Sequence, residues 1–238
     1  MTLQPGCRFV VAPHFHQRVE WLQRLLIGAG VKQLSGGFFP LHSWRPPTPD
    51  ELSHLVWTSE EPVPPEELAA CICLFQLPEH LRSRWWNLLV AVAGTLEDGP
   101  LPGFETFVSQ VVEFLAFKSL PVPEGVRCDL VVSNPELHRA NRDGGFCGRR
   151  LWGKINLGDE PTSVVLINLT RQQMEAALRR RFPDRPSALE IGGLFSDYPP
   201  VRLILEPGDG CRLPSCDMVL DHYLEGKRET DVTLSISQ

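Results

Sequence analysis

Residues 206–237 read EPGDGCRLPSCDMVLDHYLEGKRETDVTLSIS and contain the clearest structural pattern of the chain. The opening Pro207-Gly208-Asp209-Gly210 is typical of a turn, because proline presets one backbone dihedral and glycine accepts dihedrals that other residues avoid. An interrupted apolar run, CRLPSCDMVL, follows, and the charged turn LEGKRET links it to DVTLSIS. Alternation of apolar and polar residues, as in DVTLSIS, indicates a half-buried strand. This end of the chain therefore predicts short antiparallel strands joined by turns.

Three segments upstream, all beyond Pro121, have the same character: VRCDLVVSN, TSVVLINLT and VRLILEP. Each is a short run rich in β-branched residues and bounded by Gly, Pro, Asp or Asn, which favours a strand. One helix is expected among them, TRQQMEAALRRRF, with Thr170 as its N-cap and Phe182-Pro183 at its end. The second half of the chain is thus predicted to be mainly β.

The first half shows mainly helical spacing. A short strand, RFVVA at 8–12, is followed by an amphipathic pattern in HFHQRVEWLQRLLIGAG that ends at Gly28 and Gly30. Apolar residues three and four positions apart predict two further helices, at about 78–95 and 102–118. The Pro-rich stretch 35–65 predicts irregular surface chain.

Helices first and strands afterwards predict an α+β fold, in which helices brace an antiparallel barrel or sandwich. At 238 residues the chain is long enough for one sizeable core, so we expect a single domain over 1–238. Its helical part would cover about 8–120 and its β part about 121–238.

Composition excludes several classes of function. The net charge is −6 and the basic residues are scattered apart from Arg179-Arg180-Arg181, so no nucleic-acid partner is expected. Neither a secretory pattern nor an apolar run of membrane-spanning length occurs, and we expect a cytoplasmic protein without a membrane partner. The seven cysteines lack zinc-ligand spacing and are interpreted as structural thiols.

The closing segment resembles the last strands of the double-stranded β-helix superfamily, which includes cupins and Fe(II)/2-oxoglutarate oxygenases. The features that carry the resemblance are the Pro-Gly-Asp turn, an apolar strand, His222, a loop, and Arg228 ahead of the alternating strand. The resemblance implies a C-terminal antiparallel jelly-roll barrel, a double-stranded β-helix, with the N-terminal helices packed on it.

The same resemblance implies site residues. His222 would bind Fe(II), since a neutral imidazole suits this metal, and Asp221 or Asp159 would add a carboxylate. Arg228 or Arg202 would hold the 2-oxoglutarate carboxylate through paired hydrogen bonds. The spacing between His222 and Arg228 is shorter than in the family, and Asp221 or Asp231 could equally face the interior.

The upstream half of such a site departs from the family pattern. No HxD occurs between 137 and 169, where His138 and Asp143 are five positions apart. A facial triad needs two histidines and one carboxylate, so this departure argues against iron catalysis. Arg202 shares one face of its strand with Ile204, and that face is either the barrel interior or the outside of an edge strand.

A second metal pattern lies near the N-terminus. His14 and His16 followed by Glu20 resemble the spacing of the first cupin motif, which would suit a cupin-like isomerase or dioxygenase. Glu20 falls within a helical pattern and no hairpin surrounds the pair, so coincidence is the preferred interpretation.

Two functions are therefore expected. The first is Fe(II)- and 2-oxoglutarate-dependent hydroxylation of a small molecule or protein side chain. The alternative is a cupin-like binding or scaffold protein without the metal site, in which Arg202, Arg228 and Asp221 hold a small acid. No motif of hydrolases, kinases or dinucleotide-dependent enzymes is found. Substrate identity and oligomeric state stay open, because a one-residue change in strand register reverses every inward assignment.

Overall fold

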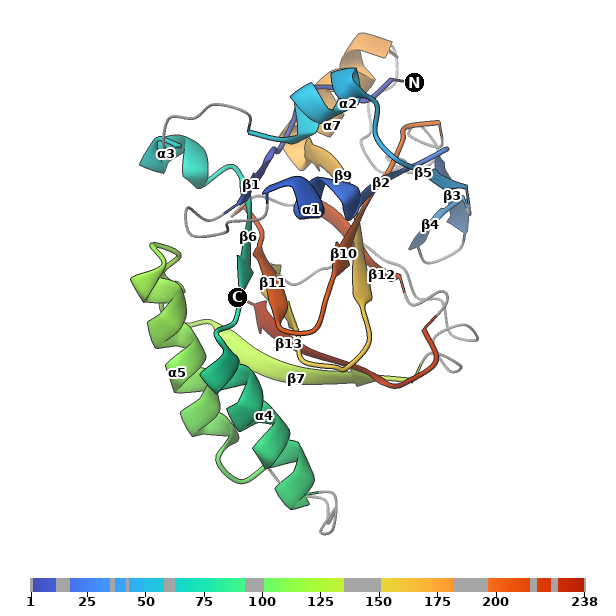
Figure 1. Cartoon of the computed structure of the whole chain (residues 1–238). Coiled ribbons are helices and arrows are strands. Elements are labelled where there is room, and N and C mark those ends of the chain that lie inside the picture. Colours follow the sequence, from blue (N-terminus) through green and yellow to red (C-terminus); the bar gives the residue numbers. More distant parts are fainter. Residues whose placement is uncertain are drawn as a thin grey trace.

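Two β-sheets form the centre of the molecule, and helices lie around them (Figure 1). The computed structural model describes residues 2–11, 18–34, 37–41, 43–57, 63–92, 101–134, 151–181, 197–214, 218–223 and 227–237. The fold is a mixture of α and β structure, as expected.

The larger sheet has six strands, in the order β1-β6-β11-β8-β13-β7. Their bounds are Phe9–Val11 for β1, Ile72–Gln76 for β6, Asp209–Arg212 for β11, Leu151–Asn156 for β8, Asp231–Ser237 for β13 and Arg127–Ser133 for β7. All neighbours are antiparallel except β1 and β6, which run parallel.

The second sheet has five antiparallel strands, in the order β12-β9-β10-β2-β5. Their bounds are Met218–Tyr223 for β12, Thr162–Thr170 for β9, Val201–Leu205 for β10, Leu25–Gly28 for β2 and Trp44–Arg45 for β5. A separate hairpin pairs β3, Val31–Leu34, with β4, Gly37–Pro40.

The chain passes repeatedly between the two sheets. It leaves β8 in the larger sheet for β9 and β10 in the smaller one, then returns for β11, crosses for β12 and ends in β13. The strands β9 and β10 are consecutive in the chain and pair with each other, whereas β8 pairs with β11 and β13, which come later. The arrangement is a two-layer β structure with helices on one side.

The two sheets face each other across an apolar core. Phe9, Ile72 and Leu74 from the larger sheet cluster with Leu25, Val164, Leu166 and Leu203 from the smaller one. Because strand residues alternate between faces, the neighbours of these residues point away from the space between the sheets.

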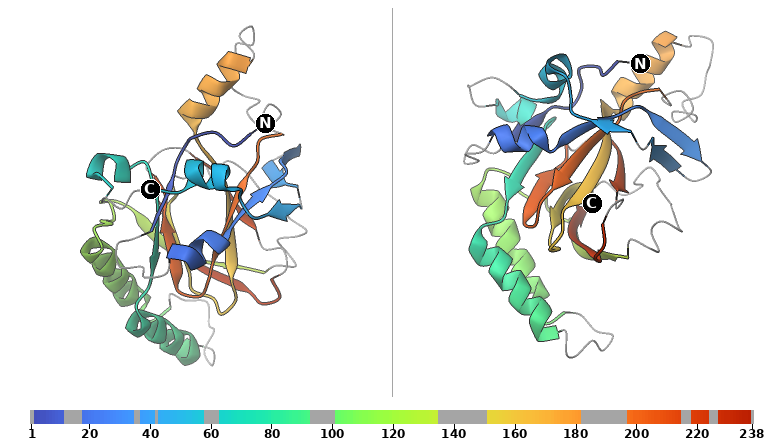
Figure 2. Two further views of the ribbon diagram at one scale, coloured as in Figure 1. Left: turned by 45° about the horizontal axis from the view of Figure 1, so that its top comes forward. Right: turned by 45° about the vertical axis from the view of Figure 1, so that its right-hand side comes forward.

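Two long helices cover the other face of the larger sheet. They are α4, Glu79–Val92, and α5, Phe104–Phe117, and they lie side by side on that face in both views of Figure 2. Phe107, Val111 and Leu115 recur on one side of α5 and are fully buried, which explains why this helix packs where it does. The Trp85 indole of α4 packs on Phe107 and donates a hydrogen bond of 2.8 Å to the Leu157 carbonyl.

Four shorter helices complete the described structure: α1, Arg18–Gln23; α2, Pro49–Leu55; α3, Pro65–Leu68; and α7, Arg171–Arg181. Thr48 caps α2 in a reciprocal capping box with Glu51. The helix α7 extends away from the sheets (Figure 2). No helix in the described ranges is long and apolar enough to cross a membrane.

Most elements predicted for the second half are confirmed: β7, β9, β10, β13 and α7 lie where the β-branched runs and the helical pattern placed them. The helices predicted at about 78–95 and 102–118 are confirmed as α4 and α5. The buried run around Cys71 and Cys73 forms β6, and both thiols are free.

The N-terminal half is less helical than predicted. The strand predicted at 8–12 is confirmed as β1, but the part assigned to helices also supplies β6 to the larger sheet and β2 and β5 to the smaller one. The predicted helix through Gly28 ends at Gln23, because Leu25–Gly28 instead forms β2 and pairs with β10. Helical spacing could not reveal this partner, which lies far along the chain. The described strands form two open sheets, and no closed barrel is found among them.

Gly210 provides a test of the contact between β11 and β6. A Cβ at this position would overlap the ring of Phe75 and lie 3.1 Å from Ile155 Cγ1, in the core below α4 and α5. We expect Gly210→Ala to lower the free energy of unfolding by about 1–3 kcal/mol through overpacking. Urea denaturation measures the change.

Val132→Ala is the matched control, because Val132 lies on β7 with 61% of its surface exposed. Its effect should stay within about 0.5 kcal/mol. Equal effects of the two substitutions would contradict the packing described here.

Candidate functional site

Six buried polar residues gather in the space between the two sheets, and we call them the polar cluster. They are Lys154 and Asn156 on β8, Thr162 on β9, Lys227, and Asp231 and Thr233 on β13. None has more than 6% of its surface exposed. Polar and charged side chains are seldom buried to this extent without a specific reason, which makes the cluster the candidate site.

Strand alternation places the cluster residues of β8 and β13 on the inner face of the larger sheet. Leu234 and Ile236 pack in the core under α4 and α5, so Asp231 and Thr233 lie on the opposite face. Lys154 is the register partner of Cys211, which belongs to the core between the sheets.

An ion pair between Lys227 and Asp231 is the centre of the cluster. The Lys227 Nζ atom lies 2.5 Å from Asp231 Oδ1, and both side chains are almost completely buried. Burial raises the pKa of Asp231, but the charges of Lys154 and Lys227 and the Thr162 hydroxyl outweigh it and lower this pKa below its ordinary value. Asp231 is therefore a carboxylate between two cationic side chains.

The hydroxyl of Thr233 adds a further polar group. Thr233 is fully buried, and its Oγ1 atom has no hydrogen-bond partner among the described residues. Its register partner is Asn156, so the hydroxyl lies on the face that carries the ion pair. A buried polar group without a partner is costly, and such groups often mark a place where a ligand or water binds.

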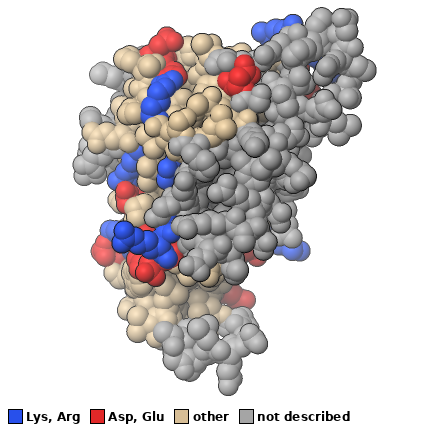
Figure 3. Space-filling model, turned by 90° about the vertical axis from the view of Figure 1, so that its right-hand side faces the viewer, with Lys and Arg blue, Asp and Glu red and all other residues tan. Residues whose placement is uncertain are grey.

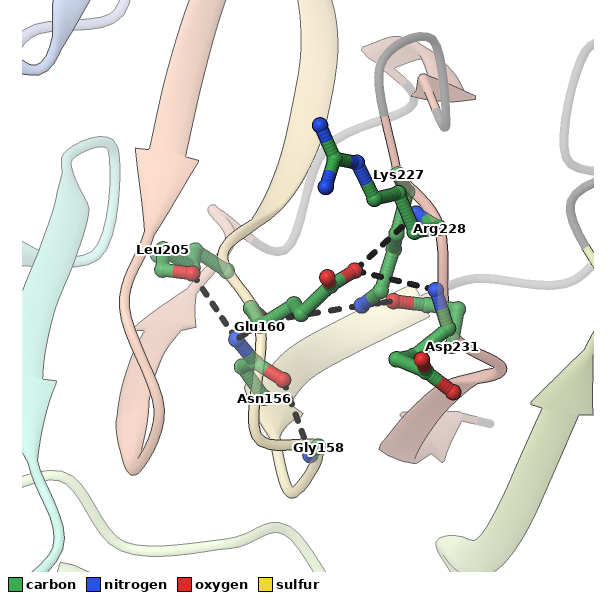
Figure 4. A network of polar contacts seen from close by, with 8 residues as sticks. Asn156, Gly158, Glu160, Leu205, Lys227, Arg228 and Asp231 are labelled. Carbon is green, nitrogen blue, oxygen red and sulfur yellow. Dashed lines mark hydrogen bonds and ion pairs between the residues drawn. The ribbon is translucent and has the colours of Figure 1, made fainter.

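Asn156 connects the two sheets at this point (Figure 4). Its Nδ2 donates to the Leu205 carbonyl of β10 at 2.9 Å and to the Glu160 carbonyl at 3.0 Å, and its Oδ1 accepts from the Gly158 amide. The amide side chain thus ties the turn between β8 and β9 to the strand across the core.

Glu160 holds the segment that carries Lys227 (Figure 4). Its Oε2 atom accepts hydrogen bonds from the backbone amides of Arg228, at 3.0 Å, and Glu229, at 3.1 Å. The amides of Glu229 and Arg228 lower the pKa of Glu160. Glu160 therefore fixes the backbone directly after Lys227, whose side chain is buried.

A second buried ion pair lies at the start of β11. Arg24 Nη1 is 2.5 Å from Asp209 Oδ2, which also accepts from the Glu206 amide at 2.9 Å. Burial raises the pKa of Asp209 to about 6 despite the neighbouring guanidinium. Asp209 belongs to the Pro-Gly-Asp-Gly turn, so this turn fixes the N-terminal strands to the C-terminal ones.

The two predicted arginines do not face the polar cluster. Arg228 is exposed, and Figure 4 shows its guanidinium extending away from Lys227 and Asp231. Arg202 lies on the outer face of the smaller sheet, where its Nε donates to Ser163 at 2.9 Å and its guanidinium stacks over Trp44. The strand of Arg202, β10, is internal to the sheet and not at its edge.

The predicted metal ligands also lie apart. Asp159 is exposed in the turn between β8 and β9. Asp221 and His222 are neighbours on β12 and pair with Val165 and Val164, so their positions fall on opposite faces of the smaller sheet. Position 222 shares the inner face with Val164, which belongs to the core.

Other predicted ligands lie outside the described residues, namely His14, His16, His138 and Asp143. Glu20 is part of α1. No group of three His, Cys, Asp or Glu residues that could hold a metal occurs in the part of the chain that the structure describes.

The sequence analysis named Asp231, with Asp221, as a residue that could face the interior. It did not predict that Lys154 and Lys227 are buried. A signal for Lys154 exists, because a lysine within LWGKIN interrupts an otherwise apolar strand. Lys227 gave no comparable signal, since it belongs to a charged turn that suggests solvent exposure. On the face in Figure 3, acidic and basic side chains of the described residues are interspersed.

The ion pair predicts a specific dependence of stability on pH. The pKa of Asp231 is lower in the folded than in the unfolded chain, so the pair stabilises the fold above about pH 3.9, and this contribution is lost as pH falls through the folded pKa. Asp231→Asn should cost about 3–5 kcal/mol at neutral pH, because it leaves a buried charge uncompensated. Chemical denaturation between neutral pH and about pH 3 measures both effects.

On acidification, the Asp231→Asn protein should lose less stability than the wild type. Asp129→Asn is the control, since Asp129 is exposed on β7. If Asp129→Asn abolished the acid dependence and Asp231→Asn did not, the assignment to the buried pair would be wrong.

Removal of the Glu160 carboxylate should free the segment that carries Lys227. We expect faster hydrogen exchange at the amides of Arg228 and Glu229 in Glu160→Gln, because their shared acceptor loses its charge. NMR detects exchange residue by residue. In the control Glu124→Gln, which changes an exposed carboxylate elsewhere, these amides should exchange at the wild-type rate.

Comparison of the chain with protein-family models, with curated proteins and with solved structures found no match in any of the three. The function is therefore argued from the polar cluster itself.

Proposed function

We propose that this chain is a jelly-roll protein that binds a small carboxylic acid between its two sheets, with Lys154 and Lys227 as the cations that receive the carboxylate. The observation that carries the proposal is the burial of two lysines around one aspartate, next to a threonine hydroxyl without a partner. The ligand is a small molecule, and the proposal includes neither nucleic acid nor membrane as a partner. The cytoplasm is the compartment expected from the sequence.

The path of the chain supports the jelly-roll assignment. From β8 to β13 the chain crosses repeatedly between two facing sheets, with β9 and β10 in the same sheet, and β13 lies between β7 and β8. Jelly rolls are double-sheet structures built from Greek keys, whose strands connect in this way.

The chemistry of the cluster supports a carboxylate as the ligand. A buried lysine needs an anionic partner, because its charge loses its hydration in the interior. Lysine ammonium groups and threonine hydroxyls both donate hydrogen bonds to carboxylate oxygens. Lys227 already forms an ion pair with one carboxylate, that of Asp231.

The described residues do not fit the iron centre of an oxygenase. A facial triad needs three ligands that converge on one point. Positions 221 and 222 are consecutive on β12, with Val165 and Val164 as their register partners, and Asp159 is exposed in a turn. One observation favours the oxygenase as a second candidate: position 222 lies on the inner face, opposite Val164. We therefore keep Fe(II) and 2-oxoglutarate as a competing hypothesis for the test.

Isothermal titration with acetate, propionate, succinate and 2-oxoglutarate tests the proposal. At least one of these acids should bind the wild type, and Lys227→Met and Lys154→Met should each weaken binding by about tenfold to a hundredfold, the contribution of a charged hydrogen bond. Arg228→Gln and Arg202→Gln are the matched controls and should keep wild-type affinity. Circular dichroism at the titration temperature verifies that each variant is folded.

Loss of binding in Arg228→Gln or Arg202→Gln, with binding retained in the lysine variants, would overturn the proposed site. The oxygenase hypothesis is tested separately by anaerobic titration with Fe(II) and 2-oxoglutarate. We expect a spectrum without a charge-transfer band. A band that disappears in His222→Ala would favour the oxygenase instead.

A further inference from the structure

The outer edge of the larger sheet is suited to pair with a second copy of the chain. The last strand of this sheet is β7, and within the described residues it pairs with β13 alone (Figure 1). A strand at the edge of a sheet presents backbone N–H and C=O groups that another strand can bind. We propose that β7 pairs antiparallel with β7 of a second copy, about a two-fold axis at Cys128, so that the two six-stranded sheets become continuous.

An open apolar groove lies beside the first residues of β7. Its volume is about 440 Å³, and Phe104, Val108 and Val112 of α5 line it. These three residues are spaced four apart and therefore lie on one side of the helix. Val126 and Cys128 also line the groove. Apolar surface of this kind is typical of a protein contact, and a two-fold axis at Cys128 brings the same groove of the second copy against it.

The position of α5 restricts how two copies can align. Cys128 and Leu130 pack against the core below α4 and α5. Arg127 and Asp129 alternate with them and are exposed. Side chains directly opposite each other in an antiparallel pair lie on the same face of the sheet. If both copies keep α5 on one side of the continuous sheet, residues of the same face must therefore lie opposite each other.

Charge selects the alignment on Cys128. In this alignment Arg127 of each copy lies opposite Asp129 of the other, so the symmetry forms two ion pairs. It also places Val126 opposite Leu130, which are both apolar. An alignment on Arg127 or on Asp129 would place like charges directly opposite each other, which is destabilising. An alignment on Leu130 would bring the two Asp129 side chains together as diagonal neighbours.

Reversal of the charges at positions 127 and 129 tests this dimer. Sedimentation equilibrium of the wild type should approach twice the mass of the chain as concentration rises. Arg127→Asp and Asp129→Arg should each weaken the dimer by about tenfold or more, because each replaces two attractive pairs by two repulsive ones. The double variant Arg127→Asp/Asp129→Arg restores opposite charges and should recover the wild-type dissociation constant.

Asp50→Arg is the matched control. It reverses the charge of an exposed residue on α2, outside the proposed contact, and should leave the dissociation constant unchanged. Circular dichroism verifies that each variant is folded.

Cross-linking through Cys128 provides a second measurement. Opposite Cα atoms in antiparallel strands are about 4.5–5.5 Å apart, within the range of about 4.4–6.8 Å that a disulfide spans. Oxidation by air with copper phenanthroline should therefore link the Cys128 thiols of two copies, and peptide mass spectrometry locates the bond. Burial and the charge of Asp129 raise the pKa of this thiol, so the reaction is run at alkaline pH. Arg127→Asp should lower the yield of this cross-link.

A wild type that stays monomeric at every concentration would overturn the proposal, and the groove beside β7 would then belong to a different partner or to none. A dimer that the single charge reversals do not weaken, or that the double variant does not recover, would place the contact elsewhere and overturn it too.

Discussion

The Lys227–Asp231 ion pair is buried between two facing sheets, and the surrounding side chains must compensate its lost hydration. Removing two charges from water costs several kcal/mol per ion, about as much as the net stability of many small proteins. The cost is offset only if the surroundings supply hydrogen bonds and complementary charge. Lys154 on β8 supplies complementary charge, and the Glu160 side chain accepts hydrogen bonds from the backbone amides that follow Lys227. The polar half of the core thus depends on the correct register of β8, β9 and β13.

The apolar and polar halves of the interior have different origins in the sequence. The apolar half combines strands from both ends of the chain, with Phe9 and Leu74 packed against Val164 and Leu203. The polar half comes from residues beyond 150 alone. The ion pair between Arg24 and Asp209 links the chain before β2 to the Pro-Gly-Asp-Gly turn, and so connects the N-terminal strands with the C-terminal ones. The N-terminal strands therefore complete both sheets, and the C-terminal strands carry the candidate chemistry.

Local patterns were sufficient to predict many of the elements but not their partners. DVTLSIS alternates and TSVVLINLT is rich in β-branched residues, which favours strands, and both are strands. The segment LLIG continues a helical pattern in the sequence. It forms β2 in the structure, because its backbone pairs with that of β10. The site was less predictable for the same reason. Arg228 and Lys227 are adjacent in a charged turn, and only the backbone held by Glu160 determines which of them enters the interior.

The parallel pair β1 and β6 has a consequence for how the chain is made. β6 lies between β1 and β11, and β11 is among the last strands to leave the ribosome. Until β11 is synthesised, one edge of β6 has no partner, although its residues are strongly apolar. Unpaired apolar edges invite association with other chains, and topologies rich in distant contacts fold slowly. The apolar edge of β6 is therefore open to association with other chains until β11 has been made.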